Sequence, residues 1–231
     1  MRFIVAMTGA SGQIYAQRLL QKLVAARHNV MLVVTEAACI SLAAETGVKV
    51  TPHSTDISKL LGFSKSHPTS RSQEEEFFDT PQSNRVLDEG AKYVQSFNPR
   101  DVGAPPASGS NRHDGMIVVP CSMGTLGRIV HGTSDDLICR AADVTLKERR
   151  KLILVTREMP LSLVHLKNMQ AAHEAGALVC HACPHFYHAP QTVEEVVDTV
   201  IDRVLDHLNV ESKTQRWRAD ELTDGSEQEA E

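Results

Sequence analysis

The sequence predicts an α/β protein whose mostly parallel sheet is covered by helices on both faces. Three observations support this fold class. Short apolar runs alternate with helical repeats at both ends of the chain, two of these runs end in turns of small and hydroxyl residues, and the 231 residues suffice for one sizeable core. We find no internal repeat, so we expect one domain at 1–210 and a polar, acidic tail at 211–231.

The first 45 residues have the pattern strand, helix, strand, helix. Residues 3–7 and 30–34 are apolar runs of strand length, and 13–26 carries apolar side chains at helical spacing. Residues 36–45 are predicted to form the second helix. Because a helix follows each strand, the strands are expected to run parallel.

Residues 52–113 interrupt this alternation, since apolar runs become few and Ser, Pro, Gly, Gln and Glu become frequent. A segment of this length without regular structure is unusual inside a compact domain. We therefore expect an extended polar arm or loop with short helical pieces, which would serve as a lid or a contact between subunits.

The alternation resumes with a buried strand at 115–119, helices at 122–131 and 135–149, a strand at 152–155, a helix at 161–175 and a short strand at 177–180. The last predicted helix, at 192–208, has the clearest pattern. Thr192 and Glu195 form a capping box there, and one apolar stripe runs along the helix.

Composition excludes several classes of protein. The net charge is −5 and Lys and Arg form no long basic stripe, so we expect no nucleic-acid binding. No apolar stretch is long enough for a membrane span, and residues 1–7 read as a strand rather than a signal peptide. Five irregularly spaced cysteines suit reduced thiols, which predicts a cytoplasmic protein.

A glycine turn, Gly9-Ala10-Ser11-Gly12, lies between the first apolar run and the first predicted helix. In this position main-chain N–H groups and the positive helix end are expected to face an anion, and Ser11 adds a hydroxyl donor. A dinucleotide site requires G-x-G-x-x-G, a pattern that this turn does not complete. The phosphate of a mononucleotide is therefore the favoured ligand, with a dinucleotide and a turn without ligand as alternatives.

Two further loops combine small and hydroxyl residues. The segment 120–125 follows a buried strand and opens a helix, and 105–110 precedes the same strand. We expect both loops to lie with the glycine turn at the carboxyl edge of the sheet, where α/β proteins bind ligands. Three such loops would suit a ligand with a flat ring and a phosphate. A plain N-cap is the alternative interpretation of Ser122.

Charged residues are concentrated at 140–150 and at 157–158, on either side of the strand at 152–155. Such a density of charge beside a buried strand is typical of a phosphate-bearing ligand or of a contact between subunits. The alternative is a set of solvated charges on a helix surface.

Together these segments resemble, in the same order, the motifs of the UbiX-type flavin prenyltransferases. The resemblance covers roughly 1–210 and rests on the following segments: Gly9-Ala10-Ser11-Gly12, Ala107-Ser108-Gly109-Ser110, residues 120–126, Arg140-Ala141-Ala142-Asp143-Val144, Leu146-Lys147-Glu148-Arg149-Arg150, Arg157-Glu158, Pro160, Asn168-Met169 and Phe186-Tyr187-His188 with Pro190-Gln191. The 140–150 and 186–191 blocks together are highly specific, whereas the glycine turn alone is not.

The resemblance implies a Rossmann-like (flavodoxin-like) three-layer sandwich that binds FMN between the subunits of a homododecamer. The implied activity joins a dimethylallyl group from dimethylallyl phosphate to N5 and C6 of reduced FMN without a metal. The product, prenylated FMN, would serve a partner decarboxylase of the UbiD type.

By its motifs, the resemblance also implies the roles of individual residues. It assigns FMN binding to Gly9, Ala10, Ser11, Thr35, Ser122, Met123, Gly124, Thr125 and Arg157. It assigns the phosphate of the prenyl donor to Lys147, Tyr187 and Arg203, with Ser108 and Gly109 lining the same pocket. The residues expected near the reaction centre are Ser11, Glu45, Arg140, Lys147 and Glu158.

The implied chemistry explains the residue types. Breaking an allylic C–O bond leaves negative charge on the departing phosphate, and Lys147, Arg203 and Tyr187 supply cations and a hydroxyl to stabilise it. Holding N5 of the flavin near the allyl carbon supplies much of the rate by orientation. Bond formation at C6 releases a proton, for which Glu158 or the released phosphate is the acceptor, while Ser11 would relay to N5. Surface cations, a core aromatic and a simple ion pair remain the alternatives for these side chains.

Several features depart from the family pattern or leave other functions open. Cys180 and Cys183 look like half of a metal site, but the sequence offers no second pair, and no metal is expected. Val102 stands where some relatives have an aromatic residue, and Trp217 is a possible substitute for it. The alternative functions are an FMN-dependent cysteine decarboxylase and a non-catalytic FMN carrier or decarboxylase subunit.

Overall fold

The computed structural model describes residues 1–53, 55–62 and 90–211. Six strands form one sheet in the order β3-β2-β1-β4-β5-β6, and every recorded pairing is parallel. This order is that of the doubly wound Rossmann-like fold, so the predicted α/β class is confirmed. The strands are β1 (Arg2–Met7), β2 (Asn29–Val34), β3 (Val94–Phe97), β4 (Gly115–Cys121), β5 (Leu152–Thr156) and β6 (Leu178–His181).

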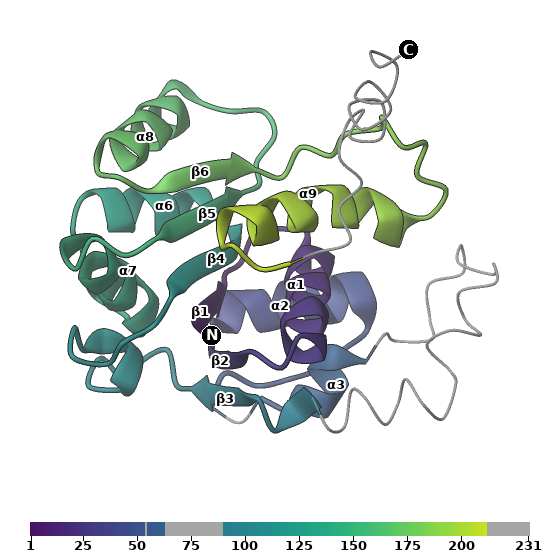
Figure 1. The fold of residues 1–231 in the computed structure, drawn as a ribbon. Coiled ribbons are helices and arrows are strands. Elements are labelled where there is room, and N and C mark those ends of the chain that lie inside the picture. Colours follow the sequence, from purple (N-terminus) through teal and green to yellow (C-terminus); the bar gives the residue numbers. More distant parts are fainter. Residues whose placement is uncertain (54, 63–89, 212–231) are drawn as a thin grey trace, which may run out of the picture.

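Helices cover both faces of the sheet and complete the three layers (Figure 1). One face packs against α1 (Gln13–Ala25), α2 (Glu36–Thr46), α3 (Ile57–Leu61) and α9 (Val193–His207). The other packs against α6 (Met123–Val130), α7 (Leu137–Lys147), α8 (Leu163–Glu174) and the short 3₁₀ helix η1 (Pro105–Ala107). Each face therefore has its own hydrophobic core, with the sheet between them.

The strands are recognisable in the sequence because covered faces require apolar side chains on both sides. All seven residues of β4 and all five of β5 are buried. In β1 only Arg2 is exposed. Continuous apolar runs of this kind are typical of parallel strands enclosed by helices, whereas alternation would indicate one solvated face.

The prediction of an arm at 52–113 is wrong in part, because β3 lies in this segment and pairs with β2 from Val30↔Val94 to Val33↔Phe97. The strand has only four residues, Val-Gln-Ser-Phe, and of these only Val94 is buried. An edge strand this short leaves almost no apolar signal. The helix α3 agrees with the expected short helical pieces, while 63–89 lies outside the described residues.

Ion pairs fix the last helix to the first. Arg18 of α1 binds Asp198 of α9 at 2.5 Å, and Lys22 binds Asp202 at 2.5 Å one turn further on. Burial raises the pKa of Asp202, while Lys22 opposes that shift. The apolar stripe predicted for 192–208 is confirmed, since it faces the core over α1.

Helix α8 differs from the other helices, because among its residues only Ala172 is buried. Leu163, Val164 and Leu166 are exposed, as is Met159 before the helix. An apolar surface of this kind commonly marks a contact with another protein chain. Within the described residues, no helix is long and apolar enough to cross a membrane.

Candidate functional site

The glycine turn is held from one side by α2. A Cβ atom on Gly9 would lie 2.5 Å from Cβ of Ala37, so only glycine fits there. The Ser41 hydroxyl, one helical turn later, donates to the Gly9 carbonyl at 3.3 Å. Gly12 has φ of 101°, a left-handed conformation that favours glycine. The turn is therefore shaped both by its own glycines and by the helix that passes beside it.

Thr8 connects the glycine turn to the second turn, at the end of β4. Its hydroxyl donates to the Pro120 carbonyl at 2.7 Å and accepts from the Ser122 main-chain N–H at 2.8 Å. Thr8 is 1% exposed, so both contacts are protected from water. Two segments more than 110 positions apart in the chain are thereby held side by side at the carboxyl edge, as predicted for these two turns.

The N-terminus of α6 retains free hydrogen-bond donors. Ser122 caps the helix by accepting from the Thr125 main-chain N–H at 3.3 Å. Among the described residues, no acceptor is recorded for the main-chain N–H of Met123 or Gly124. A Cβ on Gly124 would meet nothing within 4 Å. Two free amides, the positive helix end and open space together form a suitable place for a phosphate group.

The N-terminus of α1 is already occupied by a carboxylate. Glu45, at the end of α2, accepts from the main-chain N–H of Gly12 at 3.0 Å and of Gln13 at 2.8 Å. The expectation that the donors of the glycine turn face an external anion is therefore wrong for these two amides. Glu45 fills that place because α2 runs along the turn, which could not be read from local sequence. An anionic ligand finds its free donors at α6 instead.

Arg157 and Glu158 follow β5 at the same edge. The Arg157 main-chain N–H donates to the Cys121 carbonyl at 3.3 Å, beside the turn at the end of β4. Burial is the main cause that raises the pKa of the Tyr15 hydroxyl; Cys183 also raises it, and Arg157 lowers it. Glu158 is half-buried and accepts from the Met159 main-chain N–H at 3.1 Å. Arg157 and Glu158 therefore lie at the same edge as the two turns.

Lys147 lies beside the loop that carries Ser108 and Gly109, and together they form a second group. A Cβ on Gly109 would lie 3.1 Å from Nζ of Lys147, and Lys147 binds Glu148 at 2.6 Å. Lys147 in turn holds the pKa of Glu148 below its usual value, first through their hydrogen bond. Arg150 fixes the loop by donating to the Gly109 carbonyl at 2.6 Å.

This second group lies at the opposite edge of the sheet from the glycine turn. The loop 105–110 precedes β4, and Lys147 precedes β5, so both are at the amino ends of their strands. The expectation that 105–110 joins the two turns at the carboxyl edge is therefore wrong. A loop that enters a parallel strand must lie at the edge where that strand begins.

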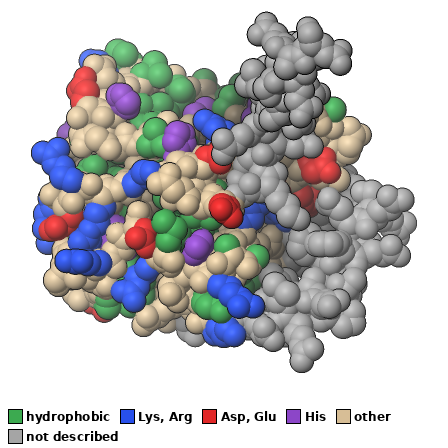
Figure 2. All heavy atoms as spheres, in the orientation of Figure 1, with side chains coloured by type: hydrophobic (Ala, Val, Ile, Leu, Met, Phe, Trp, Pro, Cys, Tyr) green, Lys and Arg blue, Asp and Glu red, His purple; other side chains and the backbone are tan. Residues whose placement is uncertain are grey.

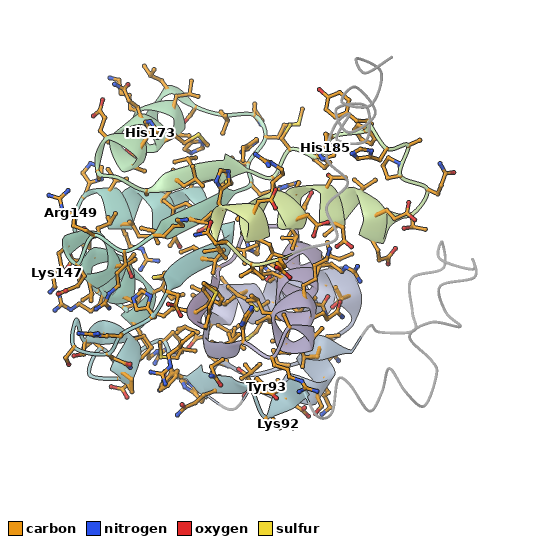
Figure 3. All side chains as sticks on the ribbon, in the orientation of Figure 1. Lys92, Tyr93, Lys147, Arg149, His173 and His185 are labelled. Carbon is orange, nitrogen blue, oxygen red and sulfur yellow. The ribbon has the colours of Figure 1, made fainter. Side chains whose placement is uncertain are left out.

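Tyr187 and Arg203 are separated from Lys147 within the chain. Tyr187 is 70% exposed, and its ring lies 5.4 Å from that of His185. Figure 3 shows His185 and Lys147 at opposite sides of the molecule. Arg203 is on α9, where it binds Asp206 at 2.9 Å. A single chain therefore does not assemble the predicted phosphate-binding trio.

The structure also gives the surroundings of two other predicted site residues, Arg140 and Thr35. Arg140, near the start of α7, binds Asp143 at 2.8 Å and is partly exposed. Thr35 caps α2 by accepting from the Ala38 main-chain N–H at 3.1 Å, and its own main-chain N–H donates to the carbonyl of Met7, two residues before Gly9, at 3.1 Å. Trp217 lies outside the described residues.

Cys180 and Cys183 are both free thiols, and neither belongs to a cluster of three potential metal ligands within the described ranges. The one group of potential metal ligands found there is Asp135, Asp136 and Cys139. Arg128 binds both carboxylates, at 2.8 and 2.6 Å, and so neutralises the charge that a cation would need.

Sequence reasoning missed Thr8 and Gln13. Gln13 is fully buried and donates from Nε2 to the carbonyls of Thr8 and Ala10 at 2.8 Å each. A polar residue directly after a glycine turn, at a helix position that faces the core, was the available signal.

A Rossmann-like sheet with a shaped glycine turn and a free helix N-terminus at its carboxyl edge defines a protein that binds a phosphate-bearing nucleotide-type ligand. The family model described as Flavoprotein matches residues 1–205. The flavin prenyltransferase UbiX of Synechocystis sp. is 39% identical over 93% of this chain and 95% of its own. The chain therefore belongs to the flavoprotein family and, within it, to the UbiX flavin prenyltransferases.

Solved structures show the same relationship. A dodecameric FMN-dependent UbiX-like decarboxylase from Escherichia coli O157:H7 is 38% identical and superposes with a TM-score of 0.71, covering 94% of this chain and 99% of its own. AnUbiX in complex with FMN and dimethylallyl pyrophosphate is 36% identical with a TM-score of 0.70, covering 94% and 98%.

Proposed function

We propose that this protein is a flavin prenyltransferase, which transfers the dimethylallyl group of dimethylallyl phosphate to reduced FMN. The bonds form at N5 and C6 of the flavin, and the product is prenylated FMN. Membership of the UbiX flavin prenyltransferases supports this activity. In the structure, the observation that carries it is the pair of anion-recognising groups, one at each edge of the sheet.

The carboxyl edge fits FMN. The free amides of Met123 and Gly124 suit its phosphate, and Arg157 adds a cation. At the turn of Gly9, Ala10 and Ser11, Ala37 leaves no room for a side chain on Gly9. Thr35, Ser122 and Thr125 add hydroxyl groups around it. When bound and reduced, FMN supplies the nucleophile of the reaction, so the chain itself needs none.

The amino edge fits the phosphate of the prenyl donor. Lys147 and Glu148 fill the space where a side chain on Gly109 would lie, and Ser108 adds a hydroxyl at the same loop. Tyr187 and Arg203 are proposed to complete this group from another chain, because His185, whose ring lies beside that of Tyr187, is at the opposite side of the molecule from Lys147, and Arg203 is on α9 rather than α7. Cations around the departing phosphate stabilise the charge that develops as the C–O bond breaks.

The site is therefore proposed to be shared between subunits. The edge that carries Ser11 would face the edge that carries Lys147 in a neighbouring copy. The apolar side chains of α8 begin five residues after Glu158, beside the carboxyl edge, and suit such a contact. A homo-oligomer follows, and the dodecameric assembly of the related UbiX-like protein supports twelve subunits.

Proton transfer is proposed for residues at the carboxyl edge. Glu158 directly follows Arg157 in the chain and is half-buried. We propose that its carboxylate accepts the proton released at C6. Ser11 is exposed at the turn and would relay a proton at N5. Glu45 contributes by holding the amides of Gly12 and Gln13, and Arg140 adds positive charge near the start of α7.

The product is proposed to pass to a UbiD-type decarboxylase. The cytoplasm is the proposed location, supported by five cysteines that are all free thiols. The alternatives, a cysteine decarboxylase and a non-catalytic FMN carrier, leave the mass of the flavin unchanged.

The mass of the flavin tests the proposed function. Purified protein is incubated without oxygen with reduced FMN and dimethylallyl phosphate, and the flavin is then extracted and weighed. We expect a product heavier than FMN by one dimethylallyl unit, formed only when protein and both reactants are present. An unchanged flavin mass, with FMN bound and still reduced, would contradict the proposal.

A further inference from the structure

A cavity of about 300 Å³ opens at the amino edge of the sheet, lined by Arg112, His113, Asp114 and Arg150. The resemblance to flavin prenyltransferases assigns no role to these four residues. Figure 2 shows Lys and Arg side chains gathered on this side of the molecule, around α7. The whole chain has a net charge of −5, so the cationic character is local.

The two guanidinium groups in the cavity have few negative partners. Arg112 has no hydrogen bond or ion pair among the residues that the structure describes. Arg150 donates to the carbonyls of Gly109 at 2.6 Å and Asn111 at 3.1 Å, which carry no net charge. Its nearest recorded carboxylate is that of Glu148 at 4.0 Å, which is closer to Lys147.

The one carboxylate in the lining has another partner. Asp114 accepts from the Arg2 main-chain N–H at 2.6 Å, which fixes it to the start of β1. Two guanidinium groups therefore share a cavity with one carboxylate, and positive charge remains to be compensated. A charged group that is partly withdrawn from water strongly favours an oppositely charged ligand.

His113 adds a buried and incompletely bonded group to the same lining. It is 8% exposed, and its Nδ1 atom is buried without a hydrogen-bond partner in the described part of the chain. Its Nε2 atom lies 3.4 Å from the Thr145 hydroxyl, which already donates to the Ala141 carbonyl at 2.6 Å. A proton on Nε2 can be donated to the Thr145 hydroxyl, and in that neutral form of the ring Nδ1 is an acceptor without a partner among the described residues.

We propose that this cavity is a binding site for a small oxyanion of the phosphate class, held by Arg112 and Arg150 beside His113. The ligand is inorganic phosphate or the phosphate group of a small ester, and both present the same oxygens to the guanidinium groups. Binding at this cavity requires neither FMN nor the prenyl donor.

Binding of the oxyanion should be linked to protonation of His113. Its pKa is lowered first by burial and then by Arg150, while the Gly115 main chain and Asp114 act in the opposite direction. The ring is therefore neutral in the empty cavity near neutral pH. A bound dianion opposes the field of Arg112 and Arg150 and raises the pKa of His113, so the protein takes up a proton. Affinity should increase as pH falls.

The test is calorimetric titration of the FMN-loaded protein with sulfate at constant ionic strength. Sulfate is the probe because its charge does not change near neutral pH. Arg112→Gln removes one charge-assisted contact and should weaken binding about tenfold or more. Arg149→Gln is the matched control, since this neighbouring cation does not line the cavity, and its affinity should equal that of the original protein.

Two further sets of titrations test the role of His113 and the identity of the oxyanion. The original protein should bind sulfate more tightly at about pH 6 than at about pH 8, and His113→Gln should remove that dependence. If His113→Gln does not fold, the sulfate affinity of Arg112→Gln compared with that of the original protein still tests the proposal. Titrations with inorganic phosphate and with methyl phosphate, each repeated on Arg112→Gln, show whether the cavity binds free phosphate or a phosphate ester more tightly. Equal sulfate affinity in Arg112→Gln and the original protein, or equal weakening by Arg149→Gln, would overturn the proposal.

Discussion

Replacing Lys147 by glutamine should slow prenyl transfer by about a hundredfold to a thousandfold while leaving FMN binding unchanged. The side chain supplies positive charge where the departing phosphate becomes more negative, and glutamine keeps the length without the charge. FMN is proposed to bind through the two turns at the carboxyl edge, which this substitution leaves intact, so its affinity should change little. The measurement is the rate at which the heavier flavin appears in a single turnover, with FMN binding followed separately by fluorescence.

Lys49→Gln provides the matched control, because Lys49 is an exposed lysine with no recorded partner in the described residues. It should react at the original rate. Loss of FMN binding in Lys147→Gln, or an unchanged transfer rate, would mean that Lys147 does not act on the prenyl donor.

Replacing Gly9 by valine should weaken FMN binding on the order of a hundredfold. A Cβ atom at this position lies 2.5 Å from Cβ of Ala37, so the turn or α2 must move. Either movement displaces the surface on which the flavin is proposed to rest. The turn lies at the edge of the sheet, and the two cores are therefore expected to remain folded. FMN fluorescence quenching gives the affinity, and thermal unfolding gives the stability.

A pair of smaller changes separates the clash from any other effect of the substitution. Gly9→Ala alone should weaken FMN binding, and Ala37→Gly should restore it when the two are combined, because the second change removes the atom that clashes. If the double variant binds FMN no better than Gly9→Ala, the shape of the turn is not set by α2.

The strands and helices were largely predictable because their signals are local. Continuous apolar runs identified the enclosed strands β1, β4 and β5, and Thr192 marked the start of α9 through its cap. The edge strand β3 escaped because four residues with one buried side chain carry no pattern. Its place in the sheet depends on pairing with β2, which is a long-range contact.

The sequence indicated which residues belong to the candidate site, but it did not indicate how these residues are arranged in space. Ser122 and Gly9 were placed correctly because each turn follows a strand. Glu45 at the α1 N-terminus depends on the path of α2, which no local pattern records. The loop at Ser108 was placed at the wrong edge, although its position before β4 was visible in the sequence. The separation of Lys147 from His185, whose ring lies beside that of Tyr187, depends on how distant segments of the chain pack, which no local pattern records.

Activity in mixed oligomers tests most directly whether the site is shared between subunits. Chains carrying Gly9→Val and chains carrying Lys147→Gln are co-expressed with different tags, and oligomers containing both are purified. Each variant alone should be nearly inactive. The mixture should recover about a quarter of the original flavin prenylation, because random mixing pairs an intact turn with an intact lysine at one site in four. Activity no higher than that of the two separate variants would contradict a site built from different chains.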